Sequence, residues 1–365
     1  MTAIDTRARA VLRELDTYKP GGSLEAAKRQ LKRASVIKLA SNENALGPSP
    51  KALAALRSAA ASLNRYPDAA CTDLRARLAK QLGVQPDSVI VGNGSDELIV
   101  LALRAFVDPG DAVVVARPTF LIYELQAKAC GAAVTAVPLN NLRYDLAAMR
   151  QAVTPHTKLV FIANPDNPTG SYVTKRELGA FLRELPHETI TFLDEAYYEF
   201  ADAPDYPQAL SYIDDHPVIV TRTFSKAYGL AGLRVGYGIA QPSLIAAMHA
   251  VREPFNVNSL AQAAAAAALE DTAFLARTRR LVKEGRRMLT AALDALKVRH
   301  VPSAANFILM HLGPRAPDIA QALLSRGVMV REMSAWKLSG YLRVTIGTPA
   351  ENRKFIQALT KCLAG

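Results

Sequence analysis

The stretch Thr221–Gly238, TRTFSKAYGLAGLRVGYG, decides how the rest of this 365-residue chain is interpreted. The apolar, β-branched run Val218–Val220 just before it is typical of a buried strand. Small hydroxyl residues and glycines then surround Lys226, and Arg234 follows after a glycine-rich turn. A turn of this kind can bring the guanidinium back beside the amine. A surface lysine is rarely presented in this way, so we expect a binding site here.

The side chains of this stretch match the functional groups that one cofactor needs. Lys226 offers an amine for a Schiff base, and the hydroxyls of Thr223 and Ser225 can bind a phosphate. The guanidinium of Arg234 adds a positive charge beside them. Together these groups predict a site for pyridoxal 5′-phosphate. The alternative is a positively charged loop on another kind of α/β protein, and the rest of the chain decides between the two.

Composition argues against several classes of protein. Half of the residues are hydrophobic, and the length suits one large α/β domain with a smaller one. The longest uncharged runs contain Gly, Pro, Asn or Gln, so we expect no membrane span, and the N-terminal segment does not resemble a secretory signal. The formal net charge is +11, but Lys and Arg are dispersed along the chain. We therefore expect a solvated basic surface and no nucleic-acid partner.

The cysteines and histidines predict neither disulfides nor a metal site. Cys71, Cys130 and Cys362 are odd in number and far apart, which favours a reducing, cytoplasmic compartment. The six histidines show no HxxxH or HxH spacing, so we expect no metal ligands.

Hydrophobic patterning predicts alternating strands and helices from about residue 50 to 240. The strands are short apolar runs, such as Leu159–Ala163 and Thr189–Leu193, which favours an α/β fold with a mostly parallel sheet covered by helices on both faces. The last hundred residues predict a smaller α+β domain, with its first strand near Val298. The predicted division is an N-terminal arm over 1–45 that packs with the small domain, a large domain over 46–265 and a small domain over 266–365.

Three polar motifs follow predicted strands at their C-terminal ends, where parallel sheets bind ligands. GNGSDE (Gly92–Glu97) opens a helix whose free backbone N–H groups suit an anion, although it matches neither the dinucleotide nor the triphosphate fingerprint. In PDNPTG, Asn167 is biased to an extended conformation by Pro168, and an ordinary turn is the alternative. Asp194 ends a buried strand, where a carboxylate needs a cationic partner, and a structural salt bridge is the alternative.

The motifs NPTG, DEAY and SKAYGLAGLR closely resemble the signatures of fold type I, class I and II aminotransferases. With TYKPGG, LASNENALGPSP, NRYPD and LRVTIGT added, the chain looks most like the histidinol-phosphate aminotransferases of that family over nearly its whole length. The central motifs are specific for the fold and the cofactor and less so for the substrate. Ala45 replaces a proline that many relatives carry, which removes no chemical group.

The resemblance implies a role for each matching residue. Lys226 would form the Schiff base and carry a proton between substrate and cofactor, and Asp194 would pair with the pyridinium nitrogen. Tyr197 and Asn167 would bond the ring oxygen. Tyr66 would reach the cofactor phosphate of a second subunit, which implies a homodimer. Further contacts to the phosphate and the ring would come from Gly94, Ser95, Asp96, Phe120, Thr223, Ser225 and Arg234.

For the substrate, the resemblance implies that Arg343 binds an anionic group and that Arg331 and Tyr18 bind a phosphate, with Asn167 nearby. The implied reaction is amino transfer between L-histidinol phosphate and 2-oxoglutarate in histidine biosynthesis. Alternatives that stay open are an aromatic-amino-acid aminotransferase, in which Arg343 binds a carboxylate, and a threonine-phosphate decarboxylase. A non-catalytic, cofactor-binding regulator and a generic nucleotide-binding protein are more distant alternatives.

Overall fold

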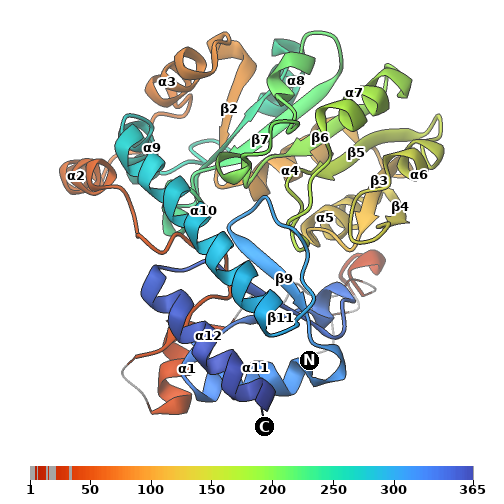
Figure 1. Cartoon of the computed structure of the whole chain (residues 1–365). Helices are drawn as coiled ribbons and strands as arrows, with labels where there is room; N and C mark the ends of the chain where they lie inside the picture. Colours follow the sequence, from red (N-terminus) through yellow and green to blue (C-terminus); the bar gives the residue numbers. More distant parts are fainter. Residues whose placement is uncertain (1–4, 6, 14, 16–21, 33–34, 365) are drawn as a thin grey trace.

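The structure, a computed structural model, describes residues 5, 7–13, 15, 22–32 and 35–364. Figure 1 shows a larger body around one sheet and, below it, a smaller body that contains the C-terminal helices α11 (Ala316–Ser325) and α12 (Pro349–Ala364). The long helix α10 (Thr272–Ala295) runs from the larger body into the smaller one (Figure 1). Nowhere in the described ranges is a helix both long enough and apolar enough to cross a membrane.

Within the described residues, the larger body contains a seven-stranded sheet in the order β2-β8-β7-β6-β5-β3-β4. Neighbouring strands are parallel except at β8, which runs antiparallel to both β2 and β7. The predicted α/β fold with a mostly parallel sheet is therefore confirmed. The strands are β2 Val89–Gly92, β3 Ala112–Arg117, β4 Ala133–Pro138, β5 Thr157–Ala163, β6 Ile190–Asp194, β7 Val218–Thr223 and β8 Gly236–Ile239.

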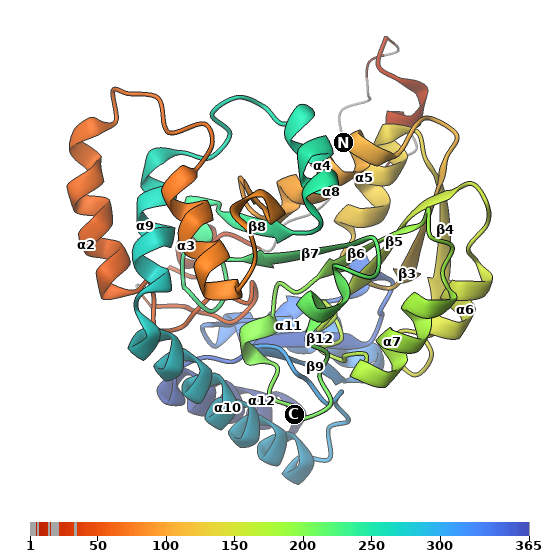
Figure 2. The same cartoon turned by 90° about the horizontal axis from the view of Figure 1, so that it is seen from above.

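Helices cover both faces of this sheet, which is why its central strands are continuous apolar runs. Every residue of β6 and β7 is buried. Figure 2 shows α4, α5 and α8 on one side of the sheet and α6 and α7 on the other. Of these helices, α8 has no counterpart among the elements predicted from the sequence. The bounds are α4 Ser95–Phe106, α5 Ile122–Cys130, α6 Leu146–Gln151, α7 Lys175–Glu184 and α8 Pro242–Ala250.

Three further helices, α2 (Pro50–Ala59), α3 (Thr72–Leu82) and α9 (Ser259–Leu269), form one flank of the larger body (Figures 1 and 2). Helix α9 packs along α2 and against α3. Its buried face consists mostly of alanines, whose small side chains let the helix axes come close.

The smaller body contains an antiparallel sheet in the order β11-β12-β9, beside which β1 pairs in parallel with β10. The strand expected near Val298 does not form; the chain turns there and makes only an isolated bridge from His300 to Met310. The helix near the N-terminus is α1 Leu24–Leu31, and the strands are β1 Ile37–Lys38, β9 Phe307–His311, β10 Val328–Met329, β11 Arg331–Glu332 and β12 Tyr341–Thr345.

The division into an arm and two domains stays a prediction. The boundary predicted at residue 265 lies inside α9, and the nearest break in helical structure is the turn between α9 and α10. For function, the important point is that the C-terminal ends of the strands β3, β5, β6 and β7 all face the smaller body.

Candidate active site

A cavity of about 290 Å³ lies where the C-terminal ends of these strands meet β11 and β12 of the smaller body. Most of the residues predicted from the sequence line it together. They come from segments that are far apart in the chain, so only the folded sheet assembles them. The predicted residues in the lining are Ser95, Asp96, Phe120, Asn167, Asp194, Tyr197, Thr223, Ser225, Lys226, Arg234, Arg331 and Arg343.

Lys226 lies in the turn after β7, and its amine faces this cavity. Its Nζ donates to the backbone carbonyl of Ser41 (3.4 Å) and lies 5.7 Å from the centre of the Tyr197 ring. Burial lowers the pKa of Lys226 to about 8, and the positive charges of Arg343 and Arg234 act in the same direction. The amine therefore loses its proton much more readily near neutral pH than an ordinary lysine does, as a nucleophilic lysine requires.

Asp194 is the last residue of β6, and its carboxylate is held from two sides. Its Oδ1 accepts from the backbone N–H of Ala196 (3.0 Å), and its Oδ2 accepts from the phenol of Tyr123 (2.6 Å). Burial raises the pKa of Asp194 to about 6, although the two hydrogen bonds and the charge of Lys226 oppose the shift. Because no guanidinium pairs with it in the described contacts, this buried acid is suited to a cationic ligand group.

The N-terminus of α4 provides a cradle for a phosphate. The helix has no side-chain cap, so backbone N–H groups at Ser95 and Asp96 remain available to an anion. Gly94 adopts φ +80°, and a Cβ built there would lie 2.7 Å from Nη2 of Arg234. A Cβ on Gly236 would lie 2.6 Å from the backbone nitrogen of Ser95, so a glycine at position 236 is needed for β8 and α4 to approach.

Arg234 and Ser225 complete this cradle. Arg234 has φ 55°, in the left-handed region, which turns its guanidinium back toward β7. It donates from Nη1 to Oγ of Ser225 (3.4 Å) and forms a half-exposed ion pair with Asp96 (3.2 Å). Thr223 accepts from the backbone N–H of Ser225 (3.1 Å) and so shapes the turn. The cradle therefore offers hydroxyls, a guanidinium and an open helix N-terminus, which fit the phosphate of pyridoxal phosphate. In the same cavity, the amine of Lys226 fits the aldehyde of this cofactor, and the carboxylate of Asp194 fits its ring nitrogen.

The phenol of Tyr197 is tied to the smaller body through Asn42. Asn42 Nδ2 donates to the phenol oxygen (2.9 Å), while its Oδ1 accepts from the hydroxyl of Thr345 on β12 (3.1 Å). Asn306 donates to the backbone carbonyl of Asn42 (3.0 Å). Burial raises the pKa of Tyr197 to about 12, so the phenol keeps its proton at neutral pH and can donate it to a ligand oxygen.

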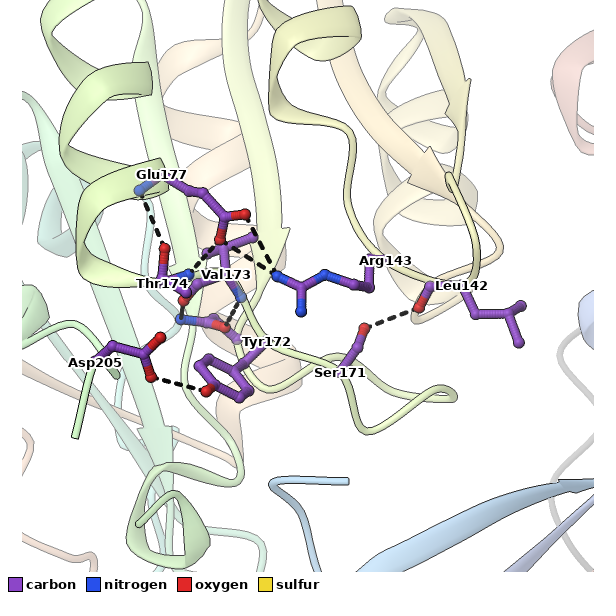
Figure 3. Close-up of polar contacts among 9 residues, drawn as sticks. Leu142, Arg143, Ser171, Tyr172, Val173, Thr174, Glu177 and Asp205 are labelled. Atoms are coloured by element: carbon purple, nitrogen blue, oxygen red, sulfur yellow. Dashed lines mark hydrogen bonds and ion pairs between the residues drawn. The ribbon is translucent and has the colours of Figure 1, made fainter. Parts of the chain in front are cut away.

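The loop after β5 carries Asn167 and is anchored at several points. Figure 3 shows Ser171 donating to the backbone carbonyl of Leu142 (2.9 Å), and Thr174 with Glu177 forming the capping box that starts α7. Glu177 also pairs with Arg143 in this view (3.3 Å). These contacts fix the outer end of the loop, away from the cavity.

The inner end of the same loop is fixed by a buried carboxylate. Asp166 accepts hydrogen bonds from the hydroxyls of Thr119 and Thr169 (both 2.7 Å), and burial raises its pKa to about 6. Asn167, the next residue, accepts a hydrogen bond from Arg343 through its Oδ1. The amide is thereby placed at the junction of the two bodies.

Arg331 and Arg343 stand directly opposite each other on β11 and β12. Like charges in this arrangement are unfavourable unless an anion or another partner compensates them. The ring of Trp336 lies 5.0 Å from the guanidinium carbon of Arg331 and 5.9 Å from that of Arg343. The pair gives the side of the cavity facing the smaller body a concentrated positive charge, suited to a dianion.

Among the predicted residues that the structure describes, Gly94 and Tyr66 do not line this cavity. Gly94 lies behind it, under Arg234. Tyr66 is 83% exposed and stacks on Phe255, with ring centroids 4.6 Å apart, at the surface of the subunit. Tyr18 lies outside the described residues.

Sequence reasoning missed Tyr123, Asn42 and Asp166. Asn42 belongs to SNEN, which loop composition alone assigns to a connection, and Asp166 belongs to PDNPTG, where attention fell on Asn167. Tyr123 lies three residues after Phe120, a spacing that places two side chains near each other at the start of a helix and was a usable signal.

The family described as aminotransferase class I and II matches this chain over residues 34–359. The chain belongs to this family. It is 45% identical over 360 residues to the histidinol-phosphate aminotransferase of Moorella thermoacetica, with 98% of this chain and 93% of that protein covered. It is 46% identical over 356 residues to histidinol-phosphate aminotransferase 2 of Pseudomonas fluorescens, with 97% and 96% covered.

Solved structures agree with this assignment. The histidinol-phosphate aminotransferase from Sinorhizobium meliloti in complex with pyridoxal 5′-phosphate superposes with a TM-score of 0.90 at 31% identity, covering 100% of this chain and 99% of that one. An aspartate aminotransferase single mutant from Thermus thermophilus superposes with a TM-score of 0.84 at 26% identity, covering 97% and 99%. The fold type I aminotransferase architecture and the pyridoxal-phosphate cofactor expected from the sequence are thereby confirmed.

Proposed function

We propose that this aminotransferase exchanges an amino group between L-histidinol phosphate and 2-oxoglutarate, in the step of histidine biosynthesis that converts imidazole-acetol phosphate with L-glutamate. The proposal rests on one observation: Lys226, Asp194 and the paired residues Arg331 and Arg343 all line the same cavity. An amine and a buried acid suit the cofactor, and two arginines suit a substrate that bears a phosphate dianion.

The bound pyridoxal phosphate supplies an electron sink for the pair released when the α-proton of the amino donor leaves. Lys226 would hold the neutral amine that attaches the cofactor, and it would then carry that α-proton from the substrate to the cofactor. Asp194 keeps a proton on the ring nitrogen, and Tyr197 donates from its phenol to the ring oxygen. The cradle formed by Ser95, Asp96, Thr223, Ser225 and Arg234 binds the cofactor phosphate.

The substrate is held from the smaller body. Arg343 binds the carboxylate of glutamate or 2-oxoglutarate, and both arginines bind the phosphate of histidinol phosphate. Asn167 contacts Arg343 and orients it. Phe120, which lines the cavity on the large-body side, covers one face of the cofactor ring.

The first test compares amino donors on the purified, cofactor-loaded enzyme. Histidinol phosphate and phenylalanine are each assayed with 2-oxoglutarate. We expect a far higher kcat/KM for histidinol phosphate. A higher kcat/KM for phenylalanine would replace the proposal by the aromatic-amino-acid alternative.

A separate test concerns the covalent role of Lys226. If the Lys226→Ala variant retains full activity and the visible absorption of the loaded protein, that role is ruled out.

The second test concerns the phosphate. Replacing Arg331 by alanine removes a charge-assisted hydrogen-bonding group worth about 1.5–3 kcal/mol, so KM for histidinol phosphate should rise about 10- to 100-fold. Arg353→Ala, which removes an exposed arginine on α12, is the control for lost charge. An equal rise of KM for unphosphorylated donors would count against the proposed contact.

We further propose that the working unit is a homodimer in which Tyr66 reaches the neighbouring active site. The support is its position: an exposed tyrosine stacked on a partly exposed Phe255 presents an aromatic surface that a second copy can cover. Subunit complementation tests this. A mixture of refolded Tyr66→Ala and Lys226→Ala chains should regain activity, because one site of each heterodimer then has both native residues. No gain over the separate variants would contradict it.

We also propose a cytoplasmic location for the enzyme. The support is that Cys71, Cys130 and Cys362 are all free thiols, two of them buried. Cell fractionation with an activity assay checks this location.

A further inference from the structure

Tyr123 points its phenol at the acid that serves the cofactor. The residue lies in the first turn of α5, which follows the C-terminal end of β3. Its side chain is only 1% exposed. The ring stacks on Phe161 of β5, with centroids 5.0 Å apart and 14° between the planes, and meets the edge of Phe120 at 5.5 Å. These two contacts hold the ring in one orientation, so the direction of the phenol is set by packing.

The hydrogen bonds of Asp194 leave its carboxylate able to accept from a ligand in the cavity. The Tyr123 phenol donates to Oδ2 (2.6 Å) and the Ala196 backbone N–H donates to Oδ1 (3.0 Å). Burial and the nearby Asp194 charge raise the pKa of Tyr123 well above its ordinary value, so the phenol is the donor at any working pH. Each carboxylate oxygen retains acceptor capacity, and Asp194 lines the cavity.

We propose that Tyr123 is a positioning residue of the transamination reaction, which holds the Asp194 carboxylate ionised and aimed at the ring nitrogen of the cofactor. The inference rests on the proposed function, because it needs the cofactor to be pyridoxal phosphate. Tyr123 also lines the cavity, but its phenol donates to Asp194, and we infer that it acts on the reaction through that carboxylate.

The physical effect concerns one proton. Asp194 and the ring nitrogen share it, either as carboxylate and pyridinium or as carboxylic acid and pyridine. A hydrogen bond donated to Oδ2 stabilises the carboxylate, because hydrogen bonds to charged groups are stronger than those to neutral ones. Tyr123 therefore keeps the proton on the ring nitrogen, where it strengthens the electron sink.

Other groups also act on this carboxylate and must stay constant in a test. The positive charge of Lys226 favours its ionised form, and the negative charge of Asp96 opposes it. Further titratable groups within electrostatic range of Asp194 are Glu195, Tyr144 and Tyr197. Changing only the phenol of Tyr123 leaves all of them in place.

The experiment compares Tyr123→Phe with Tyr144→Phe. Tyr144 is also a buried tyrosine near the cavity, but its phenol bonds Thr119 and the backbone N–H of Ala163 (3.0 Å). Both variants keep the ring and lose one hydroxyl. Cofactor affinity is measured by titrating the cofactor-free protein with pyridoxal phosphate between pH 5 and 9, and kcat and KM are measured on the loaded enzyme.

For Tyr123→Phe we expect a cofactor dissociation constant about tenfold higher at pH 7, which corresponds to 1.4 kcal/mol. The acidic limb of the affinity profile should move to higher pH, because Asp194 loses a donor that lowers its pKa. We expect kcat to fall about tenfold, with KM for the amino donor changed less than twofold. Tyr144→Phe should leave the position of the acidic limb unchanged.

A double-mutant cycle separates positioning from general damage. In an Asp194→Asn background, Tyr123→Phe should produce no further loss of cofactor affinity. The inference is overturned if Tyr123→Phe leaves the pH profile and the dissociation constant unchanged, or if its loss persists in full in the Asp194→Asn background. If the wild-type chain does not bind pyridoxal phosphate, the proposed function itself fails, and the two failures are thereby distinguished.

Discussion

The side chain of Asn42 provides one of the buried contacts between the two bodies of the protein, and its removal has a predictable cost. Asn42 bonds the phenol of Tyr197 and the hydroxyl of Thr345, and both bonds are buried. It also adopts φ 56°, in the left-handed region. Asn42→Ala removes two hydrogen bonds of about 1 kcal/mol each. It also places an alanine in a conformation that costs about 1–2 kcal/mol. We expect the free energy of unfolding to fall by about 3–4 kcal/mol.

Asn141 provides a matched control within the same chain. It also has a left-handed backbone, with φ 49°, but it is exposed, and its amide bonds only the neighbouring Asn140. Asn141→Ala therefore reports the cost of the backbone conformation alone. The difference between the variants, about 2 kcal/mol, measures the buried hydrogen bonds of Asn42.

The assay is urea unfolding at a fixed, saturating cofactor concentration. Far-UV circular dichroism and the fluorescence of Trp336, the single tryptophan, must give coincident transitions before free energies are compared. If Asn42→Ala costs no more than Asn141→Ala, the reasoning that Asn42 joins the two bodies is wrong. A smaller kcat for Asn42→Ala, with the cofactor still bound, is the accompanying functional expectation, because Tyr197 loses a partner.

Further predictions follow from the same contacts. In the cofactor-free protein, the rate of acylation of Lys226 should rise with pH, with a midpoint at about pH 8. The Arg343→Gln variant should move that midpoint to higher pH, because it removes a positive charge that lowers the pKa of Lys226. An unmoved midpoint would contradict this prediction. Arg222→Met leaves the buried carboxylate of Glu195 without its ion-pair partner (2.8 Å) and should reduce the free energy of unfolding by about 3–5 kcal/mol in the same urea assay. Gly94→Ala should weaken cofactor binding, measured by titration, because its Cβ would lie 2.7 Å from a guanidinium nitrogen of the phosphate cradle; full affinity would show that the cradle tolerates a side chain there.

The sequence was most informative where chemistry and local pattern coincide. Lys226 among glycines and hydroxyls, Asp194 at the end of an apolar run and Asn167 before a proline were each recognisable from their neighbours. The strands of the large sheet were found because burial on both faces makes them continuous apolar runs. Helix α8 was missed, since its apolar residues do not keep to one face.

The amino-acid sequence by itself determined the family, the cofactor and the set of side chains that line one cavity, because these depend on motifs in which residue type and local spacing carry the chemistry. Only the tertiary structure decided which groups support them: the phenol of Tyr123 on Asp194, the amide of Asn42 on Tyr197, and the two arginines facing each other across β11 and β12. These contacts join residues that are from 12 to 155 positions apart. Their directions are set by strand register and ring packing, which no local pattern in the chain specifies.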